Sequence, residues 1–400
     1  KREPRNGEKM NKKIISYLLC ISILFTVFFI VSEKQVYADN SNVMTLEEAI
    51  KLINDRVNSK KKTKFSTINE PYVYPILPGT KEWESFKSKD EMMDACQIPS
   101  EIVDSMSTEA LTLSVINHPL LDTEVLSYND YTQGFDSFVS AFDAAKALLE
   151  REDFAVNLAK IYLDTPVLNK EEYKEQRSNS QNTMLDFTVK ETVLAVPQVF
   201  NLLKEDEAEA LIVIAENKMK EKSENQEMYG TSVNTFFTVR ATVSGKNNRN
   251  GFATVLTPRG SSVVVITISD AEFTTQQKEQ INATYRKEYP QATIVASASK
   301  KYNCHSYAWY LSSTSNRYWM DDPSKYMSDG SYWKLNYSNV KSGAKMYWSG
   351  KQHSANVISV NSSAANGKKC TVQSKWGQGP IMKHNESYSP YNNSRTVWGR

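Results

Sequence analysis

The sequence predicts an α+β protein, with an all-helical N-terminal region from 39 to 229 and a C-terminal module from 230 to 400 that contains an antiparallel sheet. Apolar residues recur at helical spacing from about 88 to 225, which is typical of amphipathic helices. From about 230 the chain becomes rich in Val, Thr and Phe and alternates apolar with polar residues, as strands do. An order of strands, helix and strand favours an α+β module.

The first 38 residues have the pattern of a secretory signal peptide. Lys12 and Lys13 precede an apolar run over 14–31, and the small-residue site Val-Tyr-Ala at 36–38 predicts cleavage after Ala38. Residues 1–9 are an extension upstream of Met10. The alternative is a retained membrane anchor, since the apolar run approaches the length that spans a bilayer. We expect a secreted protein whose membrane contact is limited to an uncleaved signal segment.

The helical region begins with an amphipathic helix at 44–57, opened by a Thr45-x-x-Glu48 capping box. The basic and turn-rich stretch 58–80 predicts a linker or long loop. Helices then follow, one over 135–153 and one starting near Pro197, separated by short acidic turns as in a bundle. This region has no convergent set of reactive side chains, which favours a scaffold or an interaction module.

The C-terminal module is expected to begin with a hairpin. Two Val-, Thr- and Phe-rich segments, 231–245 and 252–269, are joined by Asn and Gly residues that tolerate positive φ. A helix over 274–290 follows, with a Thr274-x-x-Gln277 capping box, and then a short strand over 292–299.

Charge divides the chain at about residue 300. Residues 39–299 hold 27 Lys and Arg against 39 Asp and Glu, whereas residues 300–400 hold 14 against 4. The second segment also holds six of the seven Trp residues. A basic, aromatic surface fits anionic polymers and sugar rings, and the acidic helical region could meet a protein partner. The alternative is that most of these rings form the core. No nucleic-acid partner is expected.

Cysteine usage excludes a disulfide scaffold. After removal of the signal the chain keeps Cys96, Cys304 and Cys370, an odd and sparse set. With four His residues and no Cys-x-x-Cys or His-x-x-x-His spacing, a structural zinc site is not expected. We expect no metal and no organic cofactor.

Cys304 is the candidate nucleophile. It opens a segment with helical spacing, and the first turn of a helix favours the thiolate of a group whose pKa in a free Cys is about 8.5. His305 points elsewhere on the helix and is expected at the surface or facing substrate. His353 opens an alternating strand over 353–360 and is the candidate base. The alternatives are a buried filler Cys and a satisfied surface His.

The strand at 370–377 is expected to pair with the His353 strand as a hairpin. Gln373 and Lys375 share one of its faces and Ser374 lies on the other. One of these side chains could orient the imidazole as the third member of a Cys-His-polar triad.

Three segments, NCHSYAWY at 303–310, KQHSANVISVN at 351–361 and VQSKWG at 372–377, resemble the motifs of the CHAP family of papain-like cysteine amidohydrolases and peptidases of bacterial cell walls, which share their logic with NlpC-type enzymes. The resemblance covers about 301–377. It implies a papain-like fold for the C-terminal module, with Cys304 as nucleophile and His353 as general base.

The resemblance also assigns further positions. It places Gln373 where the family has Glu and Lys375 where it has Asn; Gln373 can accept a bond from the imidazole and Lys375 cannot. Lys375 and Trp376 become candidates for substrate contact. The oxyanion would lie at the backbone N–H of Cys304 and a donor from Asn303 or Tyr302.

The function expected from these residues is a secreted cysteine amidohydrolase or peptidase that cleaves amide bonds in peptidoglycan. One alternative is a non-catalytic wall-binding or adhesion protein with a degenerate papain-like domain. Another is a transglutaminase-like acyl transferase, which passes the acyl group to an amine in place of water.

Overall fold

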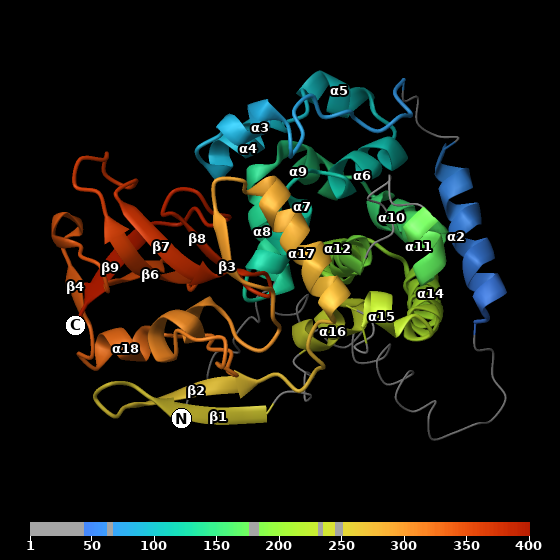
Figure 1. The fold of residues 1–400 in the computed structure, drawn as a ribbon. Coiled ribbons are helices and arrows are strands. Elements are labelled where there is room, and N and C mark those ends of the chain that lie inside the picture. The colour runs from blue at the N-terminus through green and yellow to red at the C-terminus, as the bar shows by residue number, and fades with distance from the viewer. Residues whose placement is uncertain (1–43, 62–66, 176–183, 231–234, 245–250) are drawn as a thin grey trace, which may run out of the picture. The chain divides into compact units, whose positions relative to one another are not determined.

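The computed structural model describes residues 44–61, 67–175, 184–230, 235–244 and 251–400 (Figure 1). The predicted signal segment therefore lies outside the described residues. Residues from Thr45 to Arg400 belong to one compact unit. No helix of the described chain is both long and apolar enough to cross a membrane.

Helices dominate the described part of the chain up to residue 243, whereas the sequence predicts them only as far as 229. They are α2 (Leu46–Lys61), α3 (Lys81–Ser85), α4 (Lys89–Ala95), α5 (Ser100–Ser105), α6 (Thr108–Ile116), α7 (Leu121–Ser127), α8 (Tyr131–Ala141), α9 (Asp143–Leu149), α10 (Phe154–Asp164), α11 (Lys170–Glu175), α12 (Met184–Ala195), α13 (Pro197–Phe200), α14 (Glu205–Ser223), α15 (Gln226–Tyr229) and α16 (Thr235–Val243). Side chains of Thr80, Ser88, Ser107 and Asp130 accept from backbone N–H groups at helix starts, which explains many of these boundaries.

The C-terminal part contains a seven-stranded antiparallel sheet in the order β3-β8-β7-β6-β5-β9-β4, drawn in orange and red in Figure 1. The strands are β3 (Thr293–Ala296), β4 (Trp333–Leu335), β5 (Lys345–Trp348), β6 (His353–Val360), β7 (Cys370–Lys375), β8 (Ile381–Asn385) and β9 (Arg395–Gly399). A separate hairpin joins β1 (Gly251–Leu256) to β2 (Ser262–Thr267). The remaining helical elements are α17 (Thr275–Glu288), η1 (Ser306–Tyr310), α18 (Ser324–Ser328) and η2 (Tyr337–Asn339).

Several sequence predictions are confirmed. The capping boxes at Thr45 and Thr274 open α2 and α17. The strands predicted at 292–299, 353–360 and 370–377 are β3, β6 and β7, and β6 pairs with β7 antiparallel. Mixed helix and antiparallel sheet is thus the observed class.

Two predictions about the helical region need adjustment. The helix expected over 135–153 is broken at Phe142, which separates α8 from α9. The stretch 58–80 is helical as far as Lys61, and its described part from 67 onward forms no helix or regular strand.

The hairpin expected between 231–245 and 252–269 is wrong. Residues 235–243 form helix α16, and the hairpin lies within the second segment, turning around Gly260, whose φ is +82°. Phe236 and Val239 explain the helix, because they are three residues apart and both are buried, and α16 packs against α12. Helical packing therefore continues past the predicted domain boundary at 229/230, which adjoins residues 231–234 outside the described part.

The sheet and the helices meet at two elements that matter for the site. Element η1 packs on the sheet against β6 and β7. Helix α17 lies between β3 and the helices α7 and α12 (Figure 1). The end of α7 reaches the sheet as well, since the backbone N–H of Gln378, beyond β7, donates to the carbonyl of Leu126 at 3.0 Å.

Candidate functional site

Cys304 lies at the start of a short helical segment, just before η1, and only 1% of its surface is exposed. Its Sγ donates to Oδ1 of Asn129 at 3.5 Å, and the backbone of Ser354 and His305 favours the thiolate. Burial nevertheless raises the pKa of the Cys304 thiol to about 12. The acidified thiol predicted from the helix start is therefore absent in this arrangement, because the loss of water outweighs the backbone donors.

His353 is the first residue of β6 and is fully buried. Its ring stacks on that of Tyr391, with centroids 3.6 Å apart and planes inclined by 10°, and meets the ring of Trp348 edge-on. Neither ring nitrogen has a hydrogen-bond partner among the described residues. Burial and the neighbouring histidines lower the pKa of His353 well below its usual value, so the imidazole is neutral.

Cys304 and His353 lie at elements that pack together, since the helical segment that Cys304 opens contacts β6. Ser354, the residue after His353, belongs to the η1 side of β6, because its hydroxyl bonds to the rings of His305 and Trp309. Side chains alternate along a strand, so the ring of His353 is directed to the opposite face. A thiol–imidazole pair therefore requires the ring of His353 to leave its stack on Tyr391.

Gln373 does not reach His353. It pairs with Asn356 across the β6–β7 ladder, which places it on the η1 face, and its Nε2 donates to the hydroxyl of Tyr307 at 2.6 Å. The sequence could not reveal this separation, because it depends on the register of the two strands.

Lys375 and Trp376 are structural in this arrangement. The ammonium of Lys375 donates to the carbonyls of Ser299, Gly377 and Gly379 at 2.6–2.9 Å, while burial lowers the pKa of Lys375 to about 7. Trp376 is fully buried, and its Nε1 lies 3.0 Å from Oγ of Ser374. Neither side chain is open to a substrate.

Asn303 and Tyr302 are also committed to internal contacts. Asn303 donates to the carbonyl of Met320 at 2.9 Å and to Oδ1 of Asn129 at 3.1 Å, and its own Oδ1 accepts from two backbone N–H groups. The ring of Tyr302 stacks on Tyr307 and is 2% exposed. Asn303 thus fixes the turn that presents Cys304.

His305 differs from its predicted surface position. It is fully buried, with Nδ1 2.8 Å from Oγ of Ser354 and Nε2 2.9 Å from the carbonyl of Lys351. These bonds attach the start of the Cys304 helix to the turn before β6. The sequence signal for the contact between His305 and Ser354 is the alternation of side chains along the strand from His353 onward. It directs Ser354 to the face opposite His353.

Sequence reasoning missed Asn129 and Tyr391, which contact the two principal site residues. Asn129 lies between α7 and α8, in the region to which no function was assigned, and Tyr391 lies between β8 and β9. Both are far from the quoted motifs along the chain, so only the tertiary structure reveals them.

The aromatic residues of the basic segment are mostly core. Trp309, Trp319, Trp348 and Trp376 are buried, whereas Trp333 is 56% exposed. The described residues include no cluster of three or more His, Cys, Asp or Glu side chains arranged to hold a metal ion.

Comparisons with known proteins give no family. No family model matches the chain, and neither a curated protein nor a solved structure matches it significantly. Function must therefore be argued from the site itself.

Acid is expected to destabilise the fold. All four histidines of the chain are buried, and burial lowers the pKa of His118 to about 3, of His305 and His384 to about 4, and of His353 well below its usual value. Between about pH 4 and 6.5 the unfolded chain binds protons at these rings and the folded chain does not, so stability falls as the pH falls.

Carboxyls with a raised pKa oppose this trend. Burial raises the pKa of Asp122 to about 7 and that of Glu288 well above its usual value, and it also raises the pKa values of Glu124, Glu216 and Asp321, so the folded chain binds more protons there than the unfolded chain. The four rings outweigh these carboxyls and leave a net loss of about 1 kcal/mol per pH unit on going from pH 6.5 to 5. Urea unfolding at pH 6.5 and pH 5 measures this loss of stability. Equal or greater stability at pH 5 would contradict the conclusion that the histidines are buried and neutral.

Proposed function

We propose that the protein is a secreted, cell-wall-associated cysteine amidohydrolase or peptidase with a papain-like C-terminal module, acting on amide bonds of peptidoglycan. The observation that carries the proposal is the placement of Cys304 at the start of a helical segment packed on β6, whose first residue is His353. A nucleophile on a helix and a base on an adjoining strand are the two groups that acyl transfer requires.

In the productive form the thiolate of Cys304 attacks the carbonyl carbon of the scissile amide. His353, which has taken the thiol proton, gives it to the leaving amine as the C–N bond breaks and a thioester forms. Water, deprotonated by the same imidazole, then hydrolyses the thioester and restores the thiol. The oxyanion needs donors at the turn of Cys304, and the backbone N–H groups of Cys304 and His305 belong to that turn.

The first test compares the full chain with Cys304→Ala in release of dye from labelled peptidoglycan over a prolonged incubation. We expect wild type to release dye and Cys304→Ala to release none above background, because the thioester cannot form. Cys370→Ala is the matched control, since Cys370 is also a buried thiol of the sheet module but pairs with Val360, at the end of β6 opposite to His353. Equal release by wild type and Cys304→Ala would refute the proposal.

A non-catalytic wall-binding protein is the second candidate. It is favoured by the unpaired His353 and by Lys375, which occupies the place of the family's orienting residue and is held by three carbonyls. Sedimentation of the chain with purified walls tests this function. Binding that Cys304→Ala retains, together with no hydrolysis by any variant, would support it.

A further inference from the structure

The segment 127–130, between α7 and α8, covers Cys304. Oδ1 of Asn129 accepts from Sγ of Cys304 at 3.5 Å and from Nδ2 of Asn303 at 3.1 Å. The helical region thus supplies the hydrogen-bond partner of the thiol, at the place where a nucleophile would meet a carbonyl carbon.

The same segment also acts on His353. The carbonyl of Ser127 accepts from the hydroxyl of Tyr391 at 2.5 Å, and the ring of Tyr391 is the one on which His353 stacks. Tyr391 is 4% exposed, and the bond to Ser127 fixes its ring. The partners of the thiol and of the imidazole are therefore both positioned by residues 127–130.

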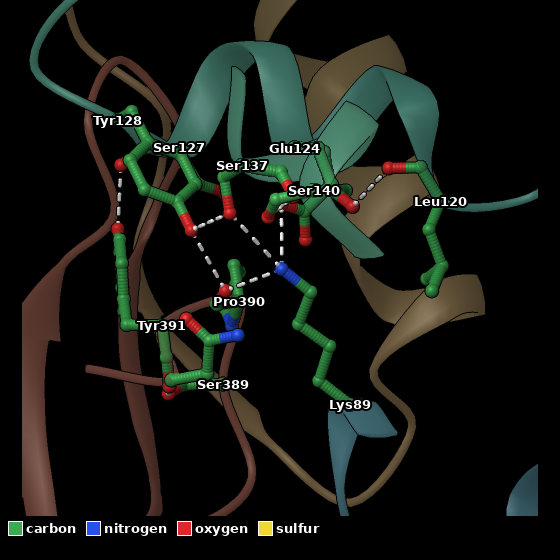
Figure 2. A network of polar contacts seen from close by, with 12 residues as sticks. Lys89, Leu120, Glu124, Ser127, Tyr128, Ser137, Ser140, Ser389, Pro390 and Tyr391 are labelled. Carbon is green, nitrogen blue, oxygen red and sulfur yellow. Dashed lines mark hydrogen bonds and ion pairs between the residues drawn. The ribbon is translucent and has the colours of Figure 1, made fainter. Parts of the chain in front are cut away.

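A buried polar network anchors this segment to the sheet module (Figure 2). The ammonium of Lys89 donates to Glu124 of α7 at 2.7 Å and to the carbonyl of Pro390 at 2.9 Å, and the hydroxyl of Tyr128 donates to the same carbonyl at 3.0 Å. The carbonyl of Leu126, at the end of α7, accepts from the N–H of Gln378. These bonds join the two sides of the segment to the loops after β7 and β8.

We infer that residues 127–130 form an inhibitory latch, which holds Cys304 and His353 apart and must move before a substrate amide can reach the sulfur. The inference rests on the proposed function and adds its regulation. With the latch closed, Asn129 accepts the hydrogen bond of the Cys304 thiol, and the ring of Tyr391 stacks on the imidazole of His353. With the latch displaced, the sulfur is open to solvent and the imidazole can leave its stack to take the thiol proton. The protein as it folds is then a latent enzyme.

The substitution Gly377→Ala adds one methyl group that should open the latch. The φ of Gly377 is +49°, and a Cβ built there would lie 2.3 Å from the carbonyl oxygen of Leu126 and 2.6 Å from that of Tyr128. Both atoms belong to backbone that cannot rotate away, so Gly377→Ala must push the α7–α8 segment and the β7–β8 turn apart. Gly343→Ala is the matched control, because Gly343 has a φ of +88° and a Cβ there meets nothing within 4 Å.

The test is the rate at which iodoacetamide alkylates each thiol of the folded full chain, read by mass spectrometry. In wild type all three described thiols should react slowly, since each is buried and burial raises the pKa of each to about 12. Gly377→Ala is expected to raise the rate at Cys304 at least about tenfold and to leave Cys96 and Cys370 unchanged. Gly343→Ala should match wild type.

Asn129→Ala is the second variant, in case Gly377→Ala unfolds and exposes every thiol equally. It removes the acceptor of the thiol from a half-buried loop position, and it should raise the rate at Cys304 selectively. If Cys304 reacts no faster than the other two thiols in folded Asn129→Ala, or if wild-type Cys304 is already the fastest, the latch is refuted.

Dye release from peptidoglycan separates the latch from the proposed hydrolase. Selective alkylation of Cys304 without dye release in the opened variants upholds the latch and refutes the hydrolase. Cys304-dependent release by wild type, unchanged in the opened variants, upholds the hydrolase and refutes the latch. Release that rises together with alkylation supports both.

Discussion

His353→Phe is expected to abolish hydrolysis while leaving the chain at least as stable as wild type. In a hydrolase, loss of the general base lowers the rate by about 10³-fold or more. Stability should not suffer, because both imidazole nitrogens are buried without a hydrogen-bond partner in the described structure, and a phenyl ring keeps the stack on Tyr391. The buried imidazole of His353 costs free energy of folding in its stacked position. A catalytic role in the open form explains why a histidine lies there.

His384→Phe is the control for this prediction. His384 is equally buried, but its Nδ1 lies 2.8 Å from the carbonyl of Asn385 and its Nε2 3.0 Å from Oγ of Ser374. Removing it takes one hydrogen-bond partner from each of these groups, although Tyr388 and Trp376 still donate to them, and should cost about 1–3 kcal/mol. Urea unfolding gives the stabilities, and dye release in the Gly377→Ala background gives the activities. If His353→Phe retained activity, or lost as much stability as His384→Phe, His353 would not be the base.

Much of the fold could be predicted because local signals and tertiary packing agree there. The capping boxes at Thr45 and Thr274 and the alternation of β6 each specify their element without help from the rest of the chain. Residues 235–243 show the opposite case, since Val, Thr and Phe favour a strand, but Phe236 and Val239 are buried in contact with helices. The position of such a segment in the core decides whether it forms a helix or a strand. A local sequence pattern does not contain that position.

The sequence names Cys304 and His353 as candidates from motif order, but it could not predict the arrangement around them. The helical segment that Cys304 opens does pack against the strand that His353 begins. The face on which each side chain lies depends on register, and the cover over the thiol comes from Asn129, 175 residues earlier in the chain. Contacts of that separation leave no trace in a local sequence pattern.

Lys89→Met is expected to produce the largest loss of stability. The ion pair between Lys89 and Glu124 is 2.7 Å long, and the two side chains are 3% and 0% exposed. Removing the ammonium leaves a buried carboxylate without its cation and the carbonyl of Pro390 without one donor, which should cost about 3–5 kcal/mol. Urea unfolding at pH 7 measures the change. Lys51→Met is the control, because the Lys51–Asp55 pair is exposed, and should leave stability almost unchanged.

The double variant Lys89→Met/Glu124→Leu shows whether the loss comes from the stranded charge. With both charges replaced by apolar side chains no carboxylate is left buried, so most of the stability lost in Lys89→Met should return. The bond from Lys89 to Pro390 does not return, and this bond joins α4 to the loop that contains Tyr391. We therefore expect the double variant to be stable, and we expect iodoacetamide to alkylate its Cys304 faster than that of wild type. A double variant that stayed as unstable as Lys89→Met would show that the anchor of the latch, and not the buried charge, dominates this part of the fold.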